Sequence, residues 1–242
     1  MRTSNRTEIG LIVSVAAECR TLAGELKMAA RRGFQAYEGR IAGKNIVLVV
    51  SGMGKVNAAH AATLLMERYS PLIVMNIGIG GAYPSSGLAV GDIAIAGKEI
   101  YGDEGVLLKD GFHGTELIGI PLARMGRRKY FNEFPLDRAL ADRAVSAASL
   151  LTPCSSRKGV FVTVSACTGT KKRAIDLERR YGAICENMEG AAIAHICMLH
   201  GTPFFEMRGI SNIVGQRDLS RWNINLAAKN CQKAVIEYIR AI

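Results

Sequence analysis

The chain has 242 residues and a formal net charge of +10, with 49% hydrophobic and 21% charged residues. This composition is typical of a globular protein in water, and the length suits one large α/β domain. No run approaches the roughly 18 uninterrupted apolar residues that a membrane-spanning helix needs. We therefore expect a single domain over residues 1–242 and no membrane partner.

The cysteines and the basic residues exclude two further classes. The six cysteines include no Cys-x-x-Cys pair, and the chain is too long for a disulfide scaffold, so we expect reduced thiols in a cytoplasmic protein. The basic residues are dispersed and lack the interleaved aromatic residues of a single-strand-binding groove. We therefore expect no nucleic-acid partner, although part of the charge can help attract an anionic small substrate.

The predicted elements alternate along the chain after an expected flexible tail at 1–7. The apolar run at 9–15 follows two arginines and superficially resembles a signal peptide, but its β-branched residues favour a buried first strand. Near-continuous apolar runs typical of strands covered on both faces then alternate with stretches typical of helices. The expected strands are 9–15, 46–51, 72–78, 92–96, 160–164, 183–188 and 204–210, and the expected helices are 18–31, 56–69, 137–149, 172–181, 190–199 and 224–239.

This alternation predicts a three-layer α/β/α fold with a central mixed, mainly parallel sheet. The exception is 109–135, which contains four glycines and two prolines without clear periodicity. Connections of this length inside a compact domain are usually functional or disordered. We expect a long loop or lid over a ligand site, or a subunit contact, with a mobile surface loop as the alternative.

Two glycine-rich turns, Ser51–Lys55 and Asn76–Gly81, follow predicted strands. Neither has the spacing of a phosphate loop or of a dinucleotide fingerprint, so we interpret both as places where a ligand approaches the backbone closely. His195 and Cys197 lie on a predicted helix and His200 directly follows it, but residues two apart on a helix do not face the same way. No carboxylate lies at the spacing of a zinc motif, so we expect no metal and no cofactor.

Three polar residues, Glu18, Glu189 and Asn212, each follow a predicted buried strand. Ligands of open α/β sheets bind at strand ends, so we expect these side chains to converge at one edge of the sheet. Taken singly, each has a structural explanation, because a carboxylate at a helix start often caps the helix or interacts with its dipole.

As a set, segments from residue 9 onward resemble the purine nucleosidase and phosphorylase superfamily, and most closely its futalosine hydrolases. The resemblance implies a nucleoside phosphorylase-like fold, a homo-oligomer, and cleavage of an N-ribosidic bond in a small nucleoside substrate. The segments that carry it are 9–18, 52–59, 76–88, 90–93, 101–105, the run Glu-Asn-Met-Glu-Gly-Ala-Ala at 186–192, and Arg-Gly-Ile-Ser-Asn at 208–212 with its continuation to 222.

The resemblance also implies a role for each site residue, around a transition state with positive charge on the ribose. Glu18 would take a proton from the attacking water. Glu189 would bind the ribose hydroxyls through hydrogen bonds that strengthen as the sugar becomes cationic. The rest of the implied substrate-binding set is Gly80 beside the sugar, Met188 on the sugar or base, the backbone near Ala166 and Cys167 at the purine edge, and Arg208.

Asn212 departs from the adenine-specific members of the family, which carry aspartate at this position. The amide NH₂ can donate to O6 of a 6-oxopurine while its carbonyl accepts from a protonated N7. An aspartate would instead set a carboxylate against the O6 lone pairs. Asn212 therefore favours hypoxanthine or guanine over adenine as the base.

The similarity to futalosine hydrolases implies a substrate whose 5′ side carries a benzoate. A benzoate needs an apolar wall and a cationic anchor, and an arginine matches a carboxylate in a bidentate way. Asp218 is a candidate for donating the leaving-group proton that an amide cannot supply. The candidate wall residues are Phe112, Phe131 and Phe134, and the candidate anchors are Arg217 and Arg221.

Three other functions remain open from the sequence. A phosphorylase would use phosphate in place of water and would need converging basic side chains, for which Arg208 and Lys55 are available. A methylthioadenosine-type nucleosidase would share the fold and the two glutamates. A nucleoside-binding or storage protein would keep the fold without catalysis, and the presence of both glutamates argues against it.

Overall fold

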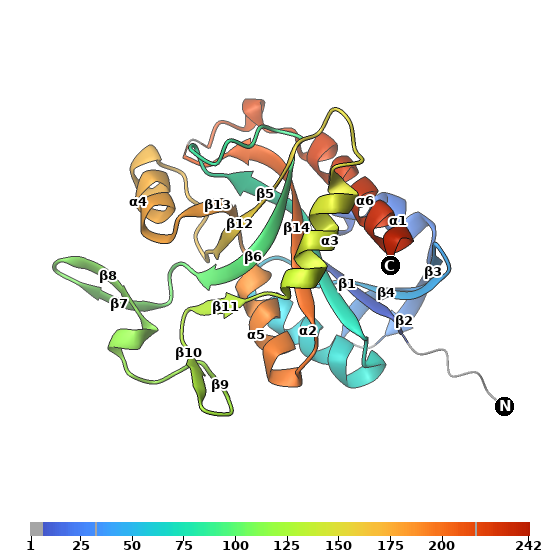
Figure 1. The fold of residues 1–242 in the computed structure, drawn as a ribbon, viewed down its shortest axis with the longest axis horizontal. Helices are drawn as coiled ribbons and strands as arrows, with labels where there is room; N and C mark the ends of the chain where they lie inside the picture. The colour runs from blue at the N-terminus through green and yellow to red at the C-terminus, as the bar shows by residue number, and fades with distance from the viewer. Residues whose placement is uncertain (1–6, 32, 216) are drawn as a thin grey trace.

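The computed structural model describes residues 7–31, 33–215 and 217–242 (Figure 1). The expected tail at 1–7 lies outside these ranges except for Thr7, which is buried. The first strand, β1 (Ile9–Val13), is buried along its whole length, as its uninterrupted apolar sequence predicts. In the described part of the chain, no helix is long and apolar enough to cross a membrane.

Ten strands of the described chain form one mixed sheet, in the order β11-β6-β12-β13-β5-β1-β4-β3-β2 with β14 paired to β5 and β6. Parallel pairs join β1 to β4, β1 to β5 and β5 to β14, so these strands end at the same edge. The bounds are β2 Lys27–Arg31, β3 Phe34–Ile41, β4 Lys44–Val50, β5 Ile73–Ala82, β6 Ile93–Tyr101, β11 Glu133–Pro135, β12 Ser156–Thr163, β13 Ala183–Asn187 and β14 Phe204–Ile213.

Part of the sheet closes on itself. β5 pairs with β14, β14 with β6, β6 with β12, β12 with β13, and β13 with β5 again, so these strands form a ring. The seams β13–β5 and β14–β6 are antiparallel. The ring explains why the carboxyl ends of β5, β13 and β14 lie close together, which a flat sheet would not require.

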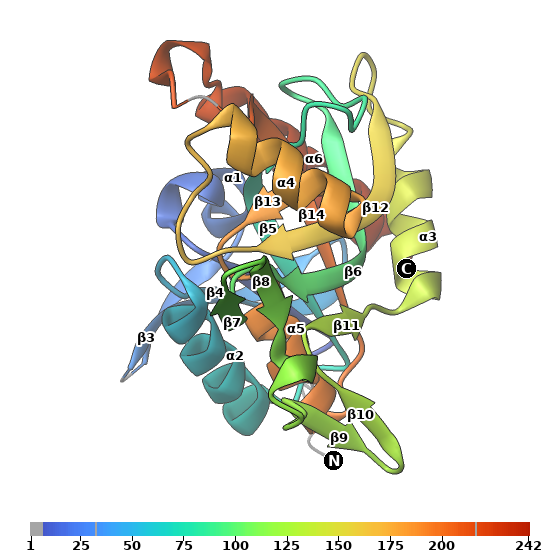
Figure 2. The same ribbon diagram turned by 90° about the vertical axis from the view of Figure 1, so that its left-hand side faces the viewer.

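Helices cover both faces of the sheet, which confirms the predicted α/β fold class. α2 (Lys55–Tyr69) and α5 (Gly190–His200) pack against each other on one side, whereas α3 (Arg138–Ala148) and α6 (Ile224–Ala241) pack together on the other (Figure 2). Two apolar clusters, one on each side, bury residues from β1, β4 and β5. The remaining helices outside the segment 109–135 are η1 Ala16–Glu18, α1 Arg20–Gly24, α4 Lys171–Tyr181 and η3 Leu219–Arg221.

The predicted helix at 18–31 is wrong beyond residue 24. α1 is a single short helix, and Lys27–Arg31 instead pairs antiparallel with β3, which pairs in turn with β4. The sheet thereby gains a hairpin, β2–β3, that the sequence analysis missed altogether. Hydrogen bonding to an existing sheet edge outweighs the modest helix preference of a lysine- and alanine-rich segment.

The segment 109–135 contains short regular elements rather than one irregular loop. Two small hairpins, β7–β8 and β9–β10, extend away from the sheet at the left of Figure 1, and β11 returns to pair with β6. The bounds are β7 Gly105–Leu108, β8 Gly111–Gly114, η2 Thr115–Leu117, β9 Ala123–Met125 and β10 Arg128–Tyr130. The side chains of Leu107, Leu108, Leu117, Ile118 and Ile120 are exposed on this extension.

Candidate active site

A cavity of about 320 Å³ lies where β1, β5, β13 and β14 end. It collects acidic, amide and apolar side chains, which is the usual composition of a site for a polar organic ligand. The residues that line it are Ser14, Val15, Glu18, Met53, Ile79, Gly80, Gly81, Cys167, Thr168, Glu186, Asn187, Met188, Glu189, Arg208, Ser211, Asn212, Val214, Arg217 and Trp222.

Glu18 enters the cavity from the short helix η1, which directly follows β1. Its carboxylate lies against β5, where a Cβ on Gly78 would come within 2.2 Å of Glu18 Oε2. Gly78 also has a φ of +148°, which side chains rarely tolerate. Gly78 is therefore needed for two reasons: its backbone conformation disfavours other residues, and a side chain here would collide with the Glu18 carboxylate.

The environment of Glu18 favours a carboxyl group that changes charge near neutral pH. Only 5% of the residue is exposed, and burial raises its pKa to about 7, with Glu189 adding to the shift. Arg208 opposes the rise, as do hydrogen bonds from the Ile79 backbone and from the Ser14 hydroxyl at 3.3 Å. A carboxylate of this kind is suited to act as a general base at physiological pH.

Glu189 occupies the position just before α5 and reaches across the cavity edge. Its Oε1 accepts a hydrogen bond from the Gly54 backbone at 3.0 Å, and its Oε2 lies 3.4 Å from Arg208 Nη2. The glycine-rich turn at Ser51–Lys55 thus positions a carboxylate through a backbone N–H. Each carboxylate oxygen keeps a second lone pair, so Glu189 can also accept hydrogen bonds from a ligand.

Arg208 is almost completely buried, with 1% of the residue exposed, and it holds the acidic groups together. Its Nε donates to Glu206 at 2.7 Å and its Nη1 to the Ile79 carbonyl at 3.2 Å. The positive charge of Arg208 also lowers the pKa of Glu18. Arg208 therefore neutralises the neighbouring carboxylates and leaves little of its charge for an anionic ligand.

Asn212 lies over Gly81, its register partner in β5. A Cβ on Gly81 would come within 2.7 Å of Val214 Cγ2 and 3.2 Å of Asn212 Nδ2, so a larger residue here would push on both side chains. The Ser211 hydroxyl lies 2.8 Å from Asn212 Oδ1 and 3.2 Å from the Gly80 carbonyl, and its single proton serves one of them at a time. When it donates to Oδ1, the Asn212 amino group remains available to a ligand.

Most of the predicted site residues meet in this cavity. Ala166 is exposed and does not line it, although its neighbour Cys167 does. Asp218 is also exposed and outside the lining. It caps η3, where it accepts hydrogen bonds from Ser220, and these bonds lower its pKa. The predicted residues that line the cavity are Glu18, Gly80, Cys167, Met188, Glu189, Arg208 and Asn212.

The sequence analysis missed an acidic residue of the cavity, Glu186. This buried carboxylate accepts hydrogen bonds from the Thr168 backbone at 2.9 Å, from the Thr168 hydroxyl at 2.6 Å and from Tyr83 at 3.0 Å. It thereby fixes the loop after β12 that carries Cys167. A polar residue within an otherwise apolar strand was the signal in the sequence.

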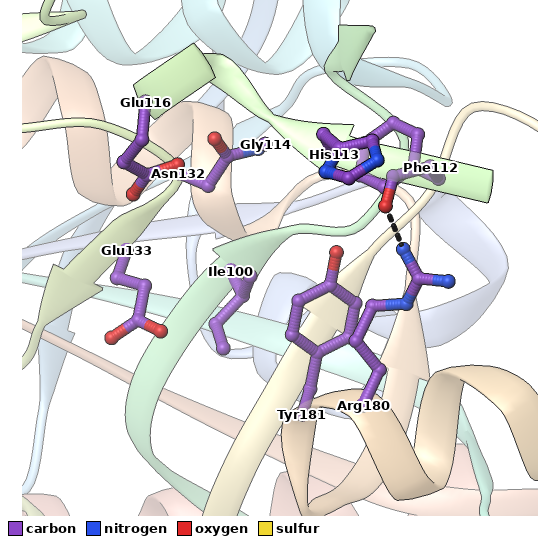
Figure 3. Close-up of a pocket in the computed structure, with 9 residues that line it drawn as sticks. All are labelled: Ile100, Phe112, His113, Gly114, Glu116, Asn132, Glu133, Arg180 and Tyr181. Atoms are coloured by element: carbon purple, nitrogen blue, oxygen red, sulfur yellow. Dashed lines mark hydrogen bonds between the residues drawn. The ribbon is translucent and has the colours of Figure 1, made fainter. Parts of the chain in front are cut away.

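The three candidate phenylalanines do not line this cavity. Phe134 is fully buried against Tyr101 and His195. Phe112 lines a second cavity, of about 400 Å³, between β8 and α4 (Figure 3). There its carbonyl accepts a hydrogen bond from Arg180 at 2.6 Å. The aromatic wall of the first cavity is Trp222 instead, with the Arg217 guanidinium 5.9 Å from its ring centre.

Known proteins are similar to this chain over most of its length. Futalosine hydrolase of Thermus thermophilus is 35% identical over 202 residues, which are 84% of this chain and 84% of that protein. The 5'-methylthioadenosine/S-adenosylhomocysteine nucleosidase of Oceanobacillus iheyensis is 30% identical over 209 residues, which are 85% of this chain and 86% of that protein.

Solved structures share the fold over nearly the whole chain. The 5'-methylthioadenosine/S-adenosylhomocysteine nucleosidase of Neisseria meningitidis, in complex with methylthio-immucillin-A, superposes with a TM-score of 0.84 at 26% identity and covers 98% of this chain and 100% of that one. Futalosine hydrolase of Helicobacter pylori superposes with a TM-score of 0.81 at 19% identity and covers 98% of both chains. Residues 8–240 match the model of the phosphorylase superfamily, and the chain belongs to that family.

Proposed function

We propose that this chain hydrolyses the N-ribosidic bond of futalosine, releasing hypoxanthine and dehypoxanthine futalosine in the futalosine route to menaquinone. At the coarser level it is an enzyme, a hydrolase of N-glycosyl compounds. The observation that carries the proposal is the pairing of two carboxylates, Glu18 and Glu189, with the Asn212 amide around one cavity. The carboxylates suit a cationic sugar, and the amide suits a 6-oxopurine.

Glu18 acts on the nucleophile. With a pKa of about 7, its carboxylate is ionised in a large share of molecules at neutral pH and can accept a proton from water. The water oxygen attacks C1′ of the ribose as the C1′–N9 bond breaks, and the bonding electrons pass to the purine. The Ser14 hydroxyl, 3.3 Å from Glu18 Oε2, holds the carboxylate in place.

Glu189 acts on the sugar. Its oxygens accept hydrogen bonds from the ribose hydroxyls while Gly54 and Arg208 keep the carboxylate oriented. Positive charge develops on the ribose in the transition state, so these hydrogen bonds strengthen as the reaction proceeds. Met188 and Gly80 complete the surface against the sugar.

Asn212 acts on the leaving base. Its amino group donates to O6 of hypoxanthine. The departing base takes a proton on N7 from solvent water, and Oδ1 of Asn212 keeps a lone pair for that N7–H while Ser211 occupies the other. The loop held by Glu186 and Thr168, with Cys167 on it, faces the other edge of the base. Asp218 has no part in this scheme, because it points to Ser220 and Arg221 rather than to the cavity.

Phosphate is a poor alternative to water at this site. The cationic residues of the lining are Arg208, which is bound to Glu206 and Glu189, and Arg217. Lys55, which the sequence left available, bonds instead to Asp103 at 2.5 Å. A phosphate dianion would meet the carboxylates of Glu18 and Glu189 without a matching set of cations.

A second candidate function is hydrolysis of methylthioadenosine or adenosylhomocysteine. It is favoured by the similarity to nucleosidases of that class at 30% identity over 85% of this chain.

The measurement that decides between the candidate functions is release of the free base from futalosine, inosine and methylthioadenosine, each with and without phosphate. We expect turnover of futalosine in phosphate-free buffer and little activity on the others. Preference for methylthioadenosine would refute the proposal, and strict phosphate dependence would make the enzyme a phosphorylase.

We expect Arg217 to anchor the substrate carboxylate beside the Trp222 ring. Its replacement by alanine should raise KM for futalosine about tenfold or more and leave KM for inosine unchanged, because only futalosine carries the carboxylate. The matched control is Arg221→Ala, since Arg221 lies outside the lining and pairs with Asp218. Steady-state kinetics on both substrates measure the effect. Equal losses in the two variants, or a loss on inosine as well, would contradict this assignment.

We also propose that the enzyme is a cytoplasmic homo-oligomer formed by one domain per chain. The exposed leucine and isoleucine side chains on the 105–120 extension give it an apolar surface for a subunit contact. Its binding partner is a small nucleoside rather than a nucleic acid, because the cavity is lined mainly by carboxylate, amide and apolar groups.

A further inference from the structure

Two glutamates outside the cavity lining lie buried beneath it. Glu99 on β6 and Glu206 on β14 are both 0% exposed. Glu99 Oε1 and Glu206 Oε2 each lie 2.2 Å from the position that a Cβ on Gly190 would take, so they are separated by no more than twice that distance. The glycine that begins α5 therefore gives space to two closely spaced carboxyl groups.

The hydrogen bonds around the pair indicate that one proton lies between them. Glu99 accepts from Thr163 at 2.7 Å on Oε2 and from Asn187 at 2.7 Å on Oε1. Glu206 Oε1 accepts from Arg208, but no group on the described residues donates a hydrogen bond to Glu206 Oε2 unless Glu99 is protonated. Two buried carboxylates this close cannot both be ionised.

Burial and the charge of Glu206 raise the pKa of Glu99 well above its usual range. The geometry and the electrostatics therefore agree that Glu99 is the protonated member and donates to Glu206. The pair then carries a single negative charge, which lies on the residue that contacts Arg208 at 2.7 Å.

The same pair is connected to both catalytic carboxylates. Arg208 binds Glu206 through Nε and Glu189 through Nη2, and its charge also acts on Glu18. Asn187, which donates to Glu99, accepts hydrogen bonds from the backbone of Glu189 and of Gly190, at 2.9 and 2.7 Å. The start of α5 and the Arg208 side chain are thus fixed by one buried network.

We propose that Glu99 and Glu206 share one proton, and that their single negative charge positions Arg208 and limits how strongly it attracts the Glu18 carboxylate. The two residues touch no substrate in this assignment and act through Arg208. The effect of the pair on catalysis through Glu18 rests on the proposed function. The shared proton itself is a property of the folded protein.

The charged and titratable groups that act on Glu18 come from several elements. Arg208 on β14 and Glu189 before α5 have opposite effects on its ionisation, and the thiols of Cys19 and Cys231 lie close enough for the Glu18 charge to raise their own pKa values. Arg208 alone among these groups carries a positive charge. A change in the neutralisation of Arg208 is therefore expected to change the ionisation of Glu18 directly.

Infrared spectroscopy tests the shared proton without any substrate. At pH 9, where Glu18 with its pKa of about 7 is ionised, the folded wild-type protein should show the C=O stretch of a protonated carboxylic acid that is absent from Glu99→Gln. The control Glu67→Gln, an exposed glutamate on α2, should leave the band unchanged. If the wild-type protein has no such band, or if the band persists in Glu99→Gln, the pair is not protonated as proposed.

The pH dependence of stability gives a second test of the shared proton, and it needs only the single variant Glu99→Gln. A group whose pKa is raised by folding stabilises the protein at low pH, and this contribution is lost as the pH rises above its ordinary value of about 4.3. The thermal midpoint of wild type should therefore fall relative to Glu99→Gln as the pH rises from 5 to 8. Parallel curves for the two proteins would overturn the proposal.

The effect on Glu18 is tested by the pH profile of kcat/KM. Glu99→Gln keeps one charge on Glu206, so its acidic limb should match that of wild type. The double variant Glu99→Gln/Glu206→Gln leaves Arg208 less neutralised, and its limb should move down by about one pH unit. A double variant that loses activity without a shift of the limb would show a purely structural role. If no substrate is hydrolysed at all, the proposed function fails, while the infrared and stability results still test the proton.

Discussion

Replacement of Glu18 by glutamine is expected to lower kcat/KM on futalosine by about 10²–10⁴-fold, the usual contribution of a general base. Glutamine has nearly the same shape and can keep the contact with Ser14, but it cannot accept a proton from water. The loss should fall mainly on kcat, because the side chain acts on the water rather than on binding of the base. Steady-state kinetics in phosphate-free buffer measure it.

The wild-type pH profile should carry the signature of the same residue. The pKa of Glu18 is about 7, so kcat/KM should rise with pH through an acidic limb near that value and then level off. The limb should be absent from the residual activity of Glu18→Gln. The exposed neighbour Glu25 supplies the matched control, since Glu25→Gln makes the same chemical change outside the cavity.

Stability separates loss of chemistry from loss of folding in this variant. Folding raises the pKa of Glu18 from 4.5 to about 7, so the ionised side chain destabilises the protein above pH 7 by on the order of 3 kcal/mol. Glu18→Gln should therefore have a higher thermal midpoint than wild type at pH 8, and the difference should shrink toward pH 5. An inactive variant that is also less stable at pH 8 would contradict the assignment of a buried, active carboxylate.

The sequence was informative where its pattern reflects burial. β1 is continuously apolar and β13 begins with an apolar run because both faces of these strands are covered, and this pattern placed Glu18 and Glu189 after strand ends. Because the parallel strands β1, β5 and β14 end at one edge, the convergence of Glu18 with Asn212 followed from the predicted topology. Glu189 follows β13, which is antiparallel to β5, and the ring of strands brings it to the same place. The structure brings all three to one cavity.

Other features depend on contacts that a local pattern does not encode. The β2–β3 hairpin forms because an open sheet edge is present, and the sequence of Lys27–Arg31 alone suggests a helix. The aromatic wall is Trp222 because the chain after β14 folds back over the cavity, whereas Phe134 is drawn into the core. The hairpin and the position of Trp222 depend on contacts between residues that are far apart in the sequence, so they cannot be predicted from the spacing of residues along the chain.

The buried pair of Glu99 and Glu206 also could not be predicted from the sequence. Glu99 and Glu206 lie 107 positions apart on different strands, and Glu206 interrupts an apolar run whereas Glu99 follows Lys98. The sequence places Glu206 in the predicted strand 204–210 and Glu99 three residues beyond the predicted strand 92–96, but it does not show that Gly190 leaves room for both at one point. Their relation to Arg208 emerges only from the closed ring of strands.

Replacement of Asn212 by aspartate is expected to reverse the base preference. Futalosine and its 6-amino analogue form the best substrate pair, because they differ only at position 6 of the purine. For the 6-oxopurine, the aspartate would lose a donated hydrogen bond and place a carboxylate against O6, with a combined cost of about 3–5 kcal/mol. The ratio of kcat/KM for futalosine to that for the analogue should therefore fall by about 10²–10⁴-fold.

The amino analogue should gain, or at least not lose, in the same variant. Its N6 amino group can donate to the aspartate, and a protonated aspartate can supply a proton to N7, which the amide cannot. The Ser211 hydroxyl, 2.8 Å from Oδ1 in wild type, can donate to the new carboxylate and keep it oriented over Gly81. Asn225→Asp makes the same change on an exposed part of α6 and should leave the ratio unchanged. An Asn212→Asp enzyme that still prefers futalosine would mean that the base is selected elsewhere in the cavity, with the loop held by Glu186 as the next residue set to examine.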